Sequence, residues 1–436
     1  MLTSGPVYDS CCALWNGAVD HRPAAVVPCA GTADVQAGVK TGQPLSVRGG
    51  GHGWTGAALA DGGVTLDLSG MRDVTVDAEA GVADVGGGAT SADVARAAHG
   101  HGFVVATGTA GAVGLAGLSL AGGYGPLSGR FGLAADNVLG AELVRADGTV
   151  INTEDDPELL WALRGGGGNF GVVTSLRVRL HRVPSLLGGM ILFPWAQATT
   201  VLTALGEQMP AAPDELTIQC GVFAGPDGNP AVFAAPTWCG DPDAGERALA
   251  GVAAAGDPLM VQVGPATQPQ MMAGIDAMFP FGRHVEIRPR NLPGLTPSAV
   301  AAIVAAGDAM TSPLSSISVH SLHGVPTRTP VDATAFGLRE PHLMIENIAM
   351  WEPGDPAAGR HRRWARDLSE ALRPEALPGG YVNLLADDET EQIAHAYGPN
   401  RDRLLAAKRR YDPDGVFRAT PLPAQEISPS TRLRLC

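Results

Sequence analysis

The chain has 436 residues, a formal net charge of −14 at pH 7 and a pI near 5.2. This length exceeds one ordinary hydrophobic core, so we expect a globular protein of two or three lobes. The excess of acidic residues argues against nucleic-acid binding, which needs a basic face. The sequence contains no run of 18 apolar residues, so no membrane span is predicted. Residues 1–5 lack the charged start and apolar region of a signal peptide, so we expect a cytoplasmic protein.

Neither a disulfide framework nor a metal site is expected. The six cysteines include the pair Cys11 and Cys12 but no Cys-x-x-Cys. His320 and His323 are three residues apart in an alternating segment, and a strand would send them to opposite faces.

Residues 1–185 are predicted to hold short strands and helices separated by many glycines. Residues 32–40 and 91–99 indicate helices, with Thr32 and Ser91 as their N-caps. A hairpin is predicted over 137–151, where an Asp-Gly turn joins two apolar runs. Period-two patterns and apolar runs predict further strands at 44–47, 64–69 and 172–180, and a short helix at 159–163.

The composition changes after residue 185. Prolines, methionines and longer amphipathic segments over 186–380 indicate a separate lobe. A charged helix is predicted from Glu389 to about Tyr411, and the residues after 418 resemble a tail. The basic residues of that helix have helical spacing and acidic neighbours, which predicts a solvated face; they are Arg401, Arg403, Lys408, Arg409 and Arg410.

The most informative stretch is the glycine loop of residues 48–56, which contains His52. Glycines let backbone N–H groups approach a phosphate closely. Residues 51–56 and 166–171 both satisfy G-x-G-x-x-G, but a strand rather than a helix is predicted after each. This argues against a Rossmann fold, which needs the following helix. No Gly-Lys-Ser/Thr occurs, which argues against a P-loop.

Seven motifs in chain order resemble one family, the FAD-linked oxidases of the vanillyl-alcohol-oxidase superfamily, in the berberine-bridge-enzyme-like branch. The resemblance runs from about Trp15 to Phe417, and its motifs lie at 47–52, 108–117, 120–125, 131–137, 161–174, 381–383 and 411–413. It implies an α+β, two-lobed FAD-binding fold of the PCMH type. Residues 1–185 and 381–418 would form the FAD domain, 186–380 an inserted substrate domain of sheet and helices, and 419–436 a tail.

In this family the histidine that matches His52 is joined covalently to the 8α carbon of the flavin. The alternative is a packed loop histidine with FAD bound non-covalently. Many relatives carry a second, cysteinyl tether in the second glycine loop, where this chain has Ala110. The chain is therefore similar to the singly tethered bacterial members, and no cysteinyl link is expected.

The resemblance also implies which residues contact FAD. The set comprises Arg48, Gly49, Gly50, Gly51, His52, Gly53, Thr109, Gly114, Gly117, Gly122, Asn137, Val173, Tyr381 and Asn383. The glycines at 49–53 and 114–117 would enclose the pyrophosphate and ribityl chain, and Val173 would pack near the adenine. For each glycine the alternative is turn geometry without contact.

Tyr381 and Asn383 are two residues apart, which would place them on one strand face that points at the flavin ring. Tyr381 is expected to be either a polar wall of the pocket or the general base. His323, which would share a face with Ser321, is the other candidate catalytic group. Relatives of the nicotine-oxidase type place ionisable groups there, and the sequence indicates that those carboxylates are absent. His320 is a weaker candidate on the other face, and Tyr124 could line the flavin or pack structurally.

The implied reaction is hydride transfer from an alcohol, amine or activated C–H of a small molecule to flavin N5, followed by reoxidation with O2 to H2O2, in secondary metabolism. A monomer or homodimer is expected. The alternatives are an oxygenating or cyclising flavoenzyme with a polyketide-like substrate, and a flavin-binding partner protein without turnover.

Overall fold

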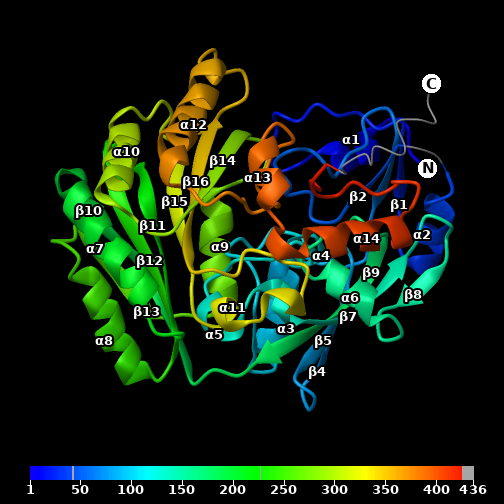
Figure 1. Cartoon of the computed structure of the whole chain (residues 1–436), viewed down its shortest axis with the longest axis horizontal. Helices are drawn as coiled ribbons and strands as arrows, with labels where there is room; N and C mark the ends of the chain where they lie inside the picture. The colour runs from blue at the N-terminus through cyan, green and yellow to red at the C-terminus, as the bar shows by residue number, and fades with distance from the viewer. Residues whose placement is uncertain (42–43, 226, 425–436) are drawn as a thin grey trace.

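A computed structural model describes residues 1–41, 44–225 and 227–424. Figure 1 shows two lobes, one built from both ends of the chain and the other from its middle. Residues 425–436 of the predicted tail lie outside the described residues. Within the described ranges, no helix is long and apolar enough to cross a membrane.

A three-stranded parallel sheet in the order β1-β3-β2 lies near the N-terminus. Its elements are β1 (Ala25–Pro28), β2 (Leu45–Arg48) and β3 (Val64–Asp67), with α1 (Pro6–Cys12) and α2 (Thr32–Gly38) beside them. The central strand β3 is buried along its whole length, as parallel strands usually are. Because β2 ends at Arg48, the loop with His52 leaves directly from the carboxyl edge of this sheet.

The second sheet of this lobe is antiparallel, in the order β4-β5-β9-β7-β8, with β6 also paired to β9. Its strands are β4 (Val74–Asp77), β5 (Val82–Gly86), β6 (Val104–Val105), β7 (Val138–Val144), β8 (Val150–Asn152) and β9 (Val172–His181). The helices are α3 (Ser91–Gly100), α4 (Leu115–Leu120), α5 (Ser128–Phe131) and α6 (Pro157–Leu163). The predicted hairpin is confirmed: β7 and β8 pair antiparallel, and Gly148 takes φ 83° in their turn.

The other lobe is a seven-stranded antiparallel sheet in the order β13-β10-β12-β11-β15-β16-β14. Its strands are β10 (Ser185–Pro194), β11 (Leu216–Ala224), β12 (Pro230–Gly240), β13 (Met260–Pro265), β14 (His284–Leu292), β15 (Ser316–Leu322) and β16 (His342–Trp351). Four helices cover one face of it, α7 (Ala198–Ala211), α8 (Pro242–Ala253), α10 (Pro297–Asp308) and α12 (Ala358–Leu372). The other face is turned toward the first lobe, where α9 (Gln268–Met278) packs on α3. The short α11 (Val325–Arg328) packs on α5.

Strand alternation divides the side chains of this sheet between its two faces. On β15, Ile317 and Val319 belong to the core beneath the helices, whereas Ser316, Ser318 and His320 line a cavity on the opposite side. The period-two pattern of the sequence therefore reflects a real division between packing residues and residues that face the first lobe.

Two predicted helix starts are wrong. The N-cap of α3 is Thr90 rather than Ser91, because Thr90 and Asp93 form a reciprocal capping box. The N-cap of α2 is Gly31, so Thr32 is the first helical residue. Both predicted helices exist, and their ends at Gly38 and Gly100 lie within two residues of the predicted ends.

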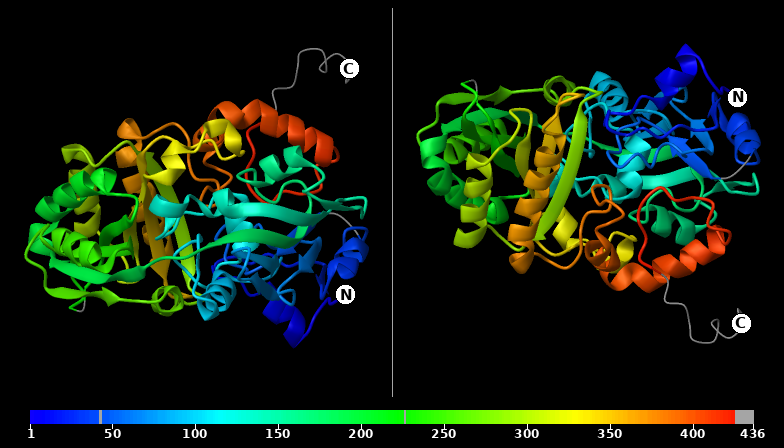
Figure 2. Two further views of the ribbon diagram at one scale, coloured as in Figure 1. Left: turned by 90° about the horizontal axis from the view of Figure 1, so that it is seen from below. Right: turned by 90° about the horizontal axis from the view of Figure 1, so that it is seen from above.

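The long charged helix predicted from Glu389 is also wrong. The chain forms α13 (Thr390–His395) and α14 (Arg401–Tyr411), separated at Gly398 and Pro399. Gly398 takes a positive φ of 47°, and proline disfavours the α conformation at the residue before it. Figure 2 shows α14, in red, on the same lobe as the blue N-terminal elements.

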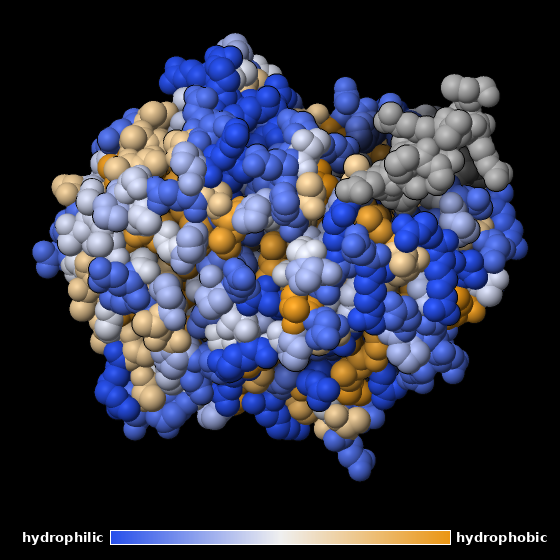
Figure 3. All heavy atoms as spheres, in the orientation of Figure 1, coloured by the Kyte–Doolittle hydropathy of each residue, from blue (hydrophilic) through white to orange (hydrophobic). Residues whose placement is uncertain are grey.

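The predicted solvated face of α14 is mostly present, since Arg403, Arg409 and Arg410 are exposed. Figure 3 shows strongly polar residues over α14 and over α12. Lys408 is the exception, because its side chain is buried. Its Nζ donates to the carbonyl oxygens of Asn169 (2.7 Å) and Phe417 (2.6 Å) and pairs with the buried carboxylate of Asp412.

Residues 419 and 420, at the start of the predicted tail, are hydrogen-bonded to the first lobe. The amide N of Ala419 donates to Asn169 Oδ1 (2.9 Å), and Asn169 Nδ2 donates to Thr420 Oγ1 (2.8 Å). Residues 419–420 are thus held against the glycine loop that ends at Gly171.

Replacing Lys408 with methionine should destabilise the protein by about 3–5 kcal/mol, because it leaves a buried carboxylate and two carbonyl oxygens without their cation. Urea unfolding of the variant measures this loss. Arg409→Met, on the exposed side of the same helix turn, is the matched control and should change stability by about 0.5 kcal/mol or less. Equal unfolding midpoints for the two variants would contradict the role given to Lys408.

Candidate active site

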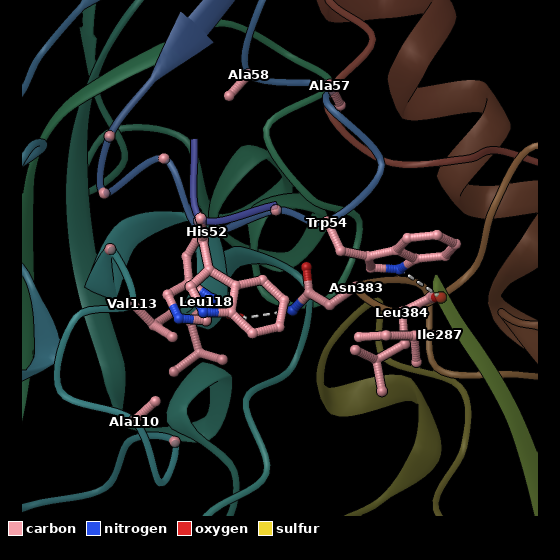
Figure 4. Close-up of a pocket in the computed structure, with 18 of the residues that line it drawn as sticks. His52, Trp54, Ala57, Ala58, Ala110, Val113, Leu118, Ile287, Asn383 and Leu384 are labelled. Carbon is pink, nitrogen blue, oxygen red and sulfur yellow. Dashed lines mark hydrogen bonds between the residues drawn. The ribbon is translucent and has the colours of Figure 1, made fainter. Parts of the chain in front are cut away.

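A cavity of about 440 Å³ lies between the two lobes. The first lobe contributes glycine-rich stretches around residues 49–53, 108–118 and 168–173, and the second lobe contributes the open face of its sheet. This volume lies in the range of small-molecule sites. Figure 4 shows part of the cavity, with His52 and Asn383 directed into it.

The two main glycine loops touch at Gly50 and Gly114. A Cβ atom at Gly50 would lie 2.4 Å from the amide N of Gly114, and one at Gly114 would lie 2.6 Å from the amide N of Gly50. Glycine is therefore required at both positions for the loops to approach this closely. Within the described chain, the amides of residues 50–53 donate no hydrogen bond to other residues, so they remain available to an anionic group.

His52 lies between aromatic rings at one side of this cavity. Its imidazole stacks on Trp15, with ring centroids 4.5 Å apart and planes 13° apart, and meets Phe281 edge-on at 5.9 Å. Trp15 is itself fixed, because its amide N donates to Gly51 O and its indole Nε1 donates to Phe279 O, both at 2.9 Å. Burial lowers the pKa of His52 to about 4, so the imidazole is neutral at neutral pH.

Ala110 also lines the cavity and lies below His52 in the view of Figure 4. Of the cysteines that the structure describes, none lines this cavity. The loop of Ala110 is held by the second lobe, because the amide N of Ala112 donates to Asp276 Oδ1 of α9 at 3.1 Å. Gln268 of α9 is buried and forms two further hydrogen bonds with the backbone of Val105.

Tyr381 and Asn383 both line the cavity, but they lie in a turn and not on a strand. They converge because Asn383 Nδ2 donates to Tyr381 Oη (2.7 Å) and to Leu118 O (3.2 Å). The carbonyl of Leu118 requires a donor, which fixes the orientation of the Asn383 amide. The amide N of Gly123 also donates to Tyr381 Oη (2.9 Å). Burial nevertheless raises the pKa of Tyr381 to about 12.

Tyr124 packs edge-on against Tyr381, with ring centroids 4.8 Å apart. Its Oη lies 2.8 Å from Nε2 of the buried His342, whose Nδ1 lies 2.7 Å from Glu340 O. A carbonyl oxygen only accepts, so His342 carries its proton on Nδ1 and Tyr124 donates to Nε2. Burial lowers the pKa of His342 to about 4, which keeps this arrangement at neutral pH.

A polar cluster on the sheet of the second lobe faces the same cavity: Gln219 on β11, Ser318 and His320 on β15, and Glu346 on β16. His320 Nε2 lies 3.0 Å from Ser318 Oγ and 3.5 Å from Glu346 Oε1. Gln219 Nε2 donates to Ser318 Oγ (2.8 Å). The negative charge of Glu346 also contributes to the raised pKa of Tyr381, so the two groups are near each other.

This cluster corrects two predictions. The cavity does contain a carboxylate, Glu346, and the histidine that faces it is His320 rather than His323. His323 follows the end of β15, is buried, and has its Nε2 3.0 Å from Leu216 O, away from the cavity lining. The missed signal was present in the sequence, because Ser316, Ser318 and His320 alternate with apolar residues and Glu346 is the lone acid of an apolar strand.

Three residues predicted to contact FAD do not line the cavity. Arg48 forms an ion pair with Asp67 at 3.0 Å, and Asn137 supports the backbone of residues 131–133. Gly122 packs against the ring of Tyr381, where an added Cβ would lie 3.0 Å from a ring carbon. The other predicted positions line the cavity, namely Gly49, Gly50, Gly51, His52, Gly53, Thr109, Gly114, Gly117, Val173, Tyr381 and Asn383.

Comparisons with known proteins agree with this architecture. Residues 23–154 match the family model "FAD binding domain", and residues 380–421 match "Berberine and berberine like". The chain is 33% identical over 430 residues to (R)-6-hydroxynicotine oxidase of Paenarthrobacter nicotinovorans, covering 94% of this chain and 93% of that protein. The chain belongs to the berberine-bridge-enzyme-like family of FAD-linked oxidoreductases.

Further members of this family show the same extent of similarity. FAD-linked oxidoreductase aurO of Gibberella zeae is 32% identical over 95% of this chain and 83% of its own length. The crystal structure of 6-hydroxy-D-nicotine oxidase from Arthrobacter nicotinovorans superposes with a TM-score of 0.87 and 30% identity, covering 98% of this chain and 97% of that chain. Berberine bridge enzyme from Eschscholzia californica, at 19% identity and TM-score 0.86 over 98% and 96% of the chains, shares the fold.

The residues present fit FAD as this family binds it. The amides of residues 50–53 are available for the pyrophosphate, and the Gly50–Gly114 contact leaves a cradle that a Cβ atom would fill. His52, Tyr381 and Asn383 line the same cavity as these loops, so they would lie beside the bound cofactor. Membership of this family makes the chain an FAD-dependent oxidase. Side chains of its second lobe line the same cavity as the glycine loops.

Acid should destabilise the protein through His181 and His342, whose pKa values burial lowers to about 4. An unfolded histidine titrates near 6.5, so between about pH 6.5 and 4 the unfolded state binds more protons. The free energy of unfolding therefore has its full value above about pH 6.5 and decreases as the pH falls from about 6.5 to 4. Burial also lowers the pKa of His52 to about 4, so replacing His342 with glutamine should remove about a third of the pH dependence that these three histidines cause, measured by urea unfolding from pH 7 to 4.5.

The control for this experiment is His101→Gln, at an exposed position. It should leave the dependence of unfolding free energy on pH unchanged. An unaltered slope in His342→Gln would show that this histidine does not titrate on unfolding as its burial indicates.

Proposed function

We propose that this chain carries FAD covalently through His52 and oxidises a small molecule by hydride transfer, with O2 as the final acceptor and H2O2 as the product. The supporting observation is one cavity in which the His52 loop and a cluster of proton-accepting side chains face each other. When bound, FAD supplies the two-electron acceptor. The reacting group belongs to an alcohol, an amine or another activated C–H, and a role in secondary metabolism stays a prediction.

His52 has the protonation state that covalent attachment requires. A neutral imidazole keeps a nucleophilic ring nitrogen, and the stack on Trp15 fixes the plane of the ring. His52 would hold the flavin through one ring nitrogen and would give up the proton that this nitrogen carries, with O2 as the two-electron oxidant for the link and H2O2 as its product. Ala110 offers no thiol, so a single link is expected.

Acid precipitation tests the link. Flavin should remain with the denatured parent protein, whereas His52→Ala should release all of it to the supernatant, as measured by absorbance. His101→Ala, at an exposed position outside the cavity, is the control and should retain the colour. Yellow precipitate from His52→Ala would place the tether elsewhere.

Glu346 is best placed to accept the proton that substrate loses with its hydride. Carboxylates are ordinarily anionic at neutral pH, whereas a phenol with a pKa of about 12 keeps its proton. Tyr381 Oη already accepts hydrogen bonds from Asn383 and Gly123, so its own hydrogen is free to donate to a substrate oxygen or nitrogen. We therefore assign orientation to Tyr381, and proton acceptance to Glu346 with His320 beside it.

Substitution of Glu346 by glutamine should slow anaerobic flavin reduction by about 10²–10⁴-fold, the usual effect of losing an acid–base group. Tyr381→Phe should slow it by about tenfold or less, since only one substrate hydrogen bond is lost. Stopped-flow absorbance of the flavin measures both rates, with the exposed Glu340→Gln as control. A larger effect in Tyr381→Phe than in Glu346→Gln would return the base to Tyr381.

The substrate for these measurements comes from an anaerobic bleaching screen of alcohols, sugars, cyclic amines and polyketide-like phenols. H2O2 in a 1:1 ratio to product supports an oxidase over an oxygenating or cyclising enzyme. Failure of every compound to bleach the flavin would favour a partner protein without turnover.

A further inference from the structure

A second cavity of about 310 Å³, which we call the side chamber, continues from the flavin cavity. The two share Thr109, Tyr124, Gln219 and His320 among their lining residues, so the side chamber begins at the polar cluster. It extends between α9 and the sheet, with Met271 and Gly274 on one side and Thr217 and Thr237 on the other. It therefore lies where the part of a substrate that does not react would extend.

The lining of the side chamber holds no formal charge apart from that which His320 can carry. No Lys, Arg, Asp or Glu side chain is among the described residues that line it. In the flavin cavity the lining cation is Arg418, which lies with Gly168 and Thr420 at the glycine-loop end. A carboxylate or phosphate in the side chamber would thus lose part of its hydration without gaining a paired cation, which costs free energy.

Three amide side chains of the side chamber are occupied within the chain: Gln268 is bonded to the backbone of Val105, Gln219 to Ser318, and Gln270 closes the capping box of α9. Ser321 Oγ, which also lines the side chamber, is buried and has no partner among the described residues, so it can bond one polar atom of a ligand. The remaining surface is rich in methionine, including Met190, Met271, Met272 and Met278, which adapts its shape to flat apolar groups.

We propose that the substrate has two parts: a reacting group held at Glu346 and Tyr381, and an uncharged, apolar, ring-containing moiety that occupies the side chamber. This inference rests on the proposed function for the flavin cavity. A cavity of roughly 150 Å³ accepts one benzene molecule, so the side chamber has room for about two ring units. Substrates with an anionic distal group are disfavoured, because the side chamber offers them no cation.

The walls of the side chamber are held in place, because α9 is tied to the first lobe by Gln268 and Asp276. Gly274 lies on its wall, and a Cβ added there meets no atom within 4 Å. A phenylalanine at this position therefore meets no collision at its Cβ and adds bulk to the wall of the side chamber. Ala235, which lines both cavities, offers a second block at their junction.

Binding rather than turnover provides the test, so that its failure is distinct from failure of the proposed function. The flavin difference spectrum of the holoprotein is titrated with three redox-stable probes: phenol, 4-phenylphenol and 4′-hydroxybiphenyl-4-carboxylate. In the parent, 4-phenylphenol should bind at least about tenfold more tightly than phenol, and the carboxylate at least about tenfold more weakly than 4-phenylphenol.

Gly274→Phe should bring the affinity for 4-phenylphenol close to that for phenol and leave phenol binding unchanged, whereas Ala235→Phe, at the junction of the two cavities, should weaken binding of 4-phenylphenol more than binding of phenol. The control Gly251→Phe lies on α8, also with no atom within 4 Å of an added Cβ, and should bind like the parent. Flavin content and thermal midpoint establish that each variant folds. Unchanged affinity for 4-phenylphenol in both blocking variants, or a carboxylate that binds as tightly as 4-phenylphenol, would overturn the proposal.

Discussion

The approach of two glycine loops at Gly50 and Gly114 determines the shape of the flavin cavity. Each glycine lies where a Cβ atom would collide with the amide of the other, so a larger residue at either position would separate the loops. Both loops are anchored on regular elements, because β2 ends at Arg48 and α4 begins at Leu115. Their contact keeps the backbone amides of residues 50–53 free and leaves His52 projecting into the cavity.

The two lobes contribute different chemistry to the cavity. The first lobe supplies mainly backbone groups, which can bind the same cofactor whatever the substrate. The second lobe supplies side chains from neighbouring strands, and alternation allows these to change without disturbing the core beneath the helices. Helix α9 joins the two contributions, since its Asp276 holds the loop beside Ala110 while its other residues line the side chamber. Cofactor binding and substrate shape are therefore linked through one helix.

Local patterns predicted much of the fold, and the errors have physical causes. Apolar alternation located β9 because one face of that strand is more buried than the other, and it located β3 although both faces of β3 are buried. The helix predicted over residues 389–411 is interrupted because a positive φ at Gly398, followed by proline, overrides good helix formers on both sides. Tyr381 and Asn383 meet in a turn through a hydrogen bond, a geometry that spacing of two residues cannot distinguish from a strand.

The substrate side of the cavity was harder to predict than the cofactor side. The alternating pattern shows that His320 and His323 lie on opposite faces of the strand. It does not show which face lines the cavity, because that depends on how β11, β15 and β16, which span more than a hundred residues, pair in the sheet. The residues around Glu346 in the sequence do not predict its contact with His320, because the pairing of β15 with β16 brings the two side chains together. The glycine loops, by contrast, require glycine at residues 50 and 114, because the backbone contact there tolerates no side chain.

The charges around the polar cluster bear both on the proposed proton acceptor, Glu346, and on the charge of the substrate. Glu346 lies among few charges, with His320 at 3.5 Å as its nearest cationic partner when protonated. In the proposed reaction, proton transfer from substrate to Glu346 would remove a partly buried negative charge as the hydride leaves, which would lower the electrostatic cost of the reaction. A substrate that brought its own anion would oppose this gain by adding a second desolvated charge. The scarcity of cations around the polar cluster and the apolar side chamber therefore favour the same class of substrate.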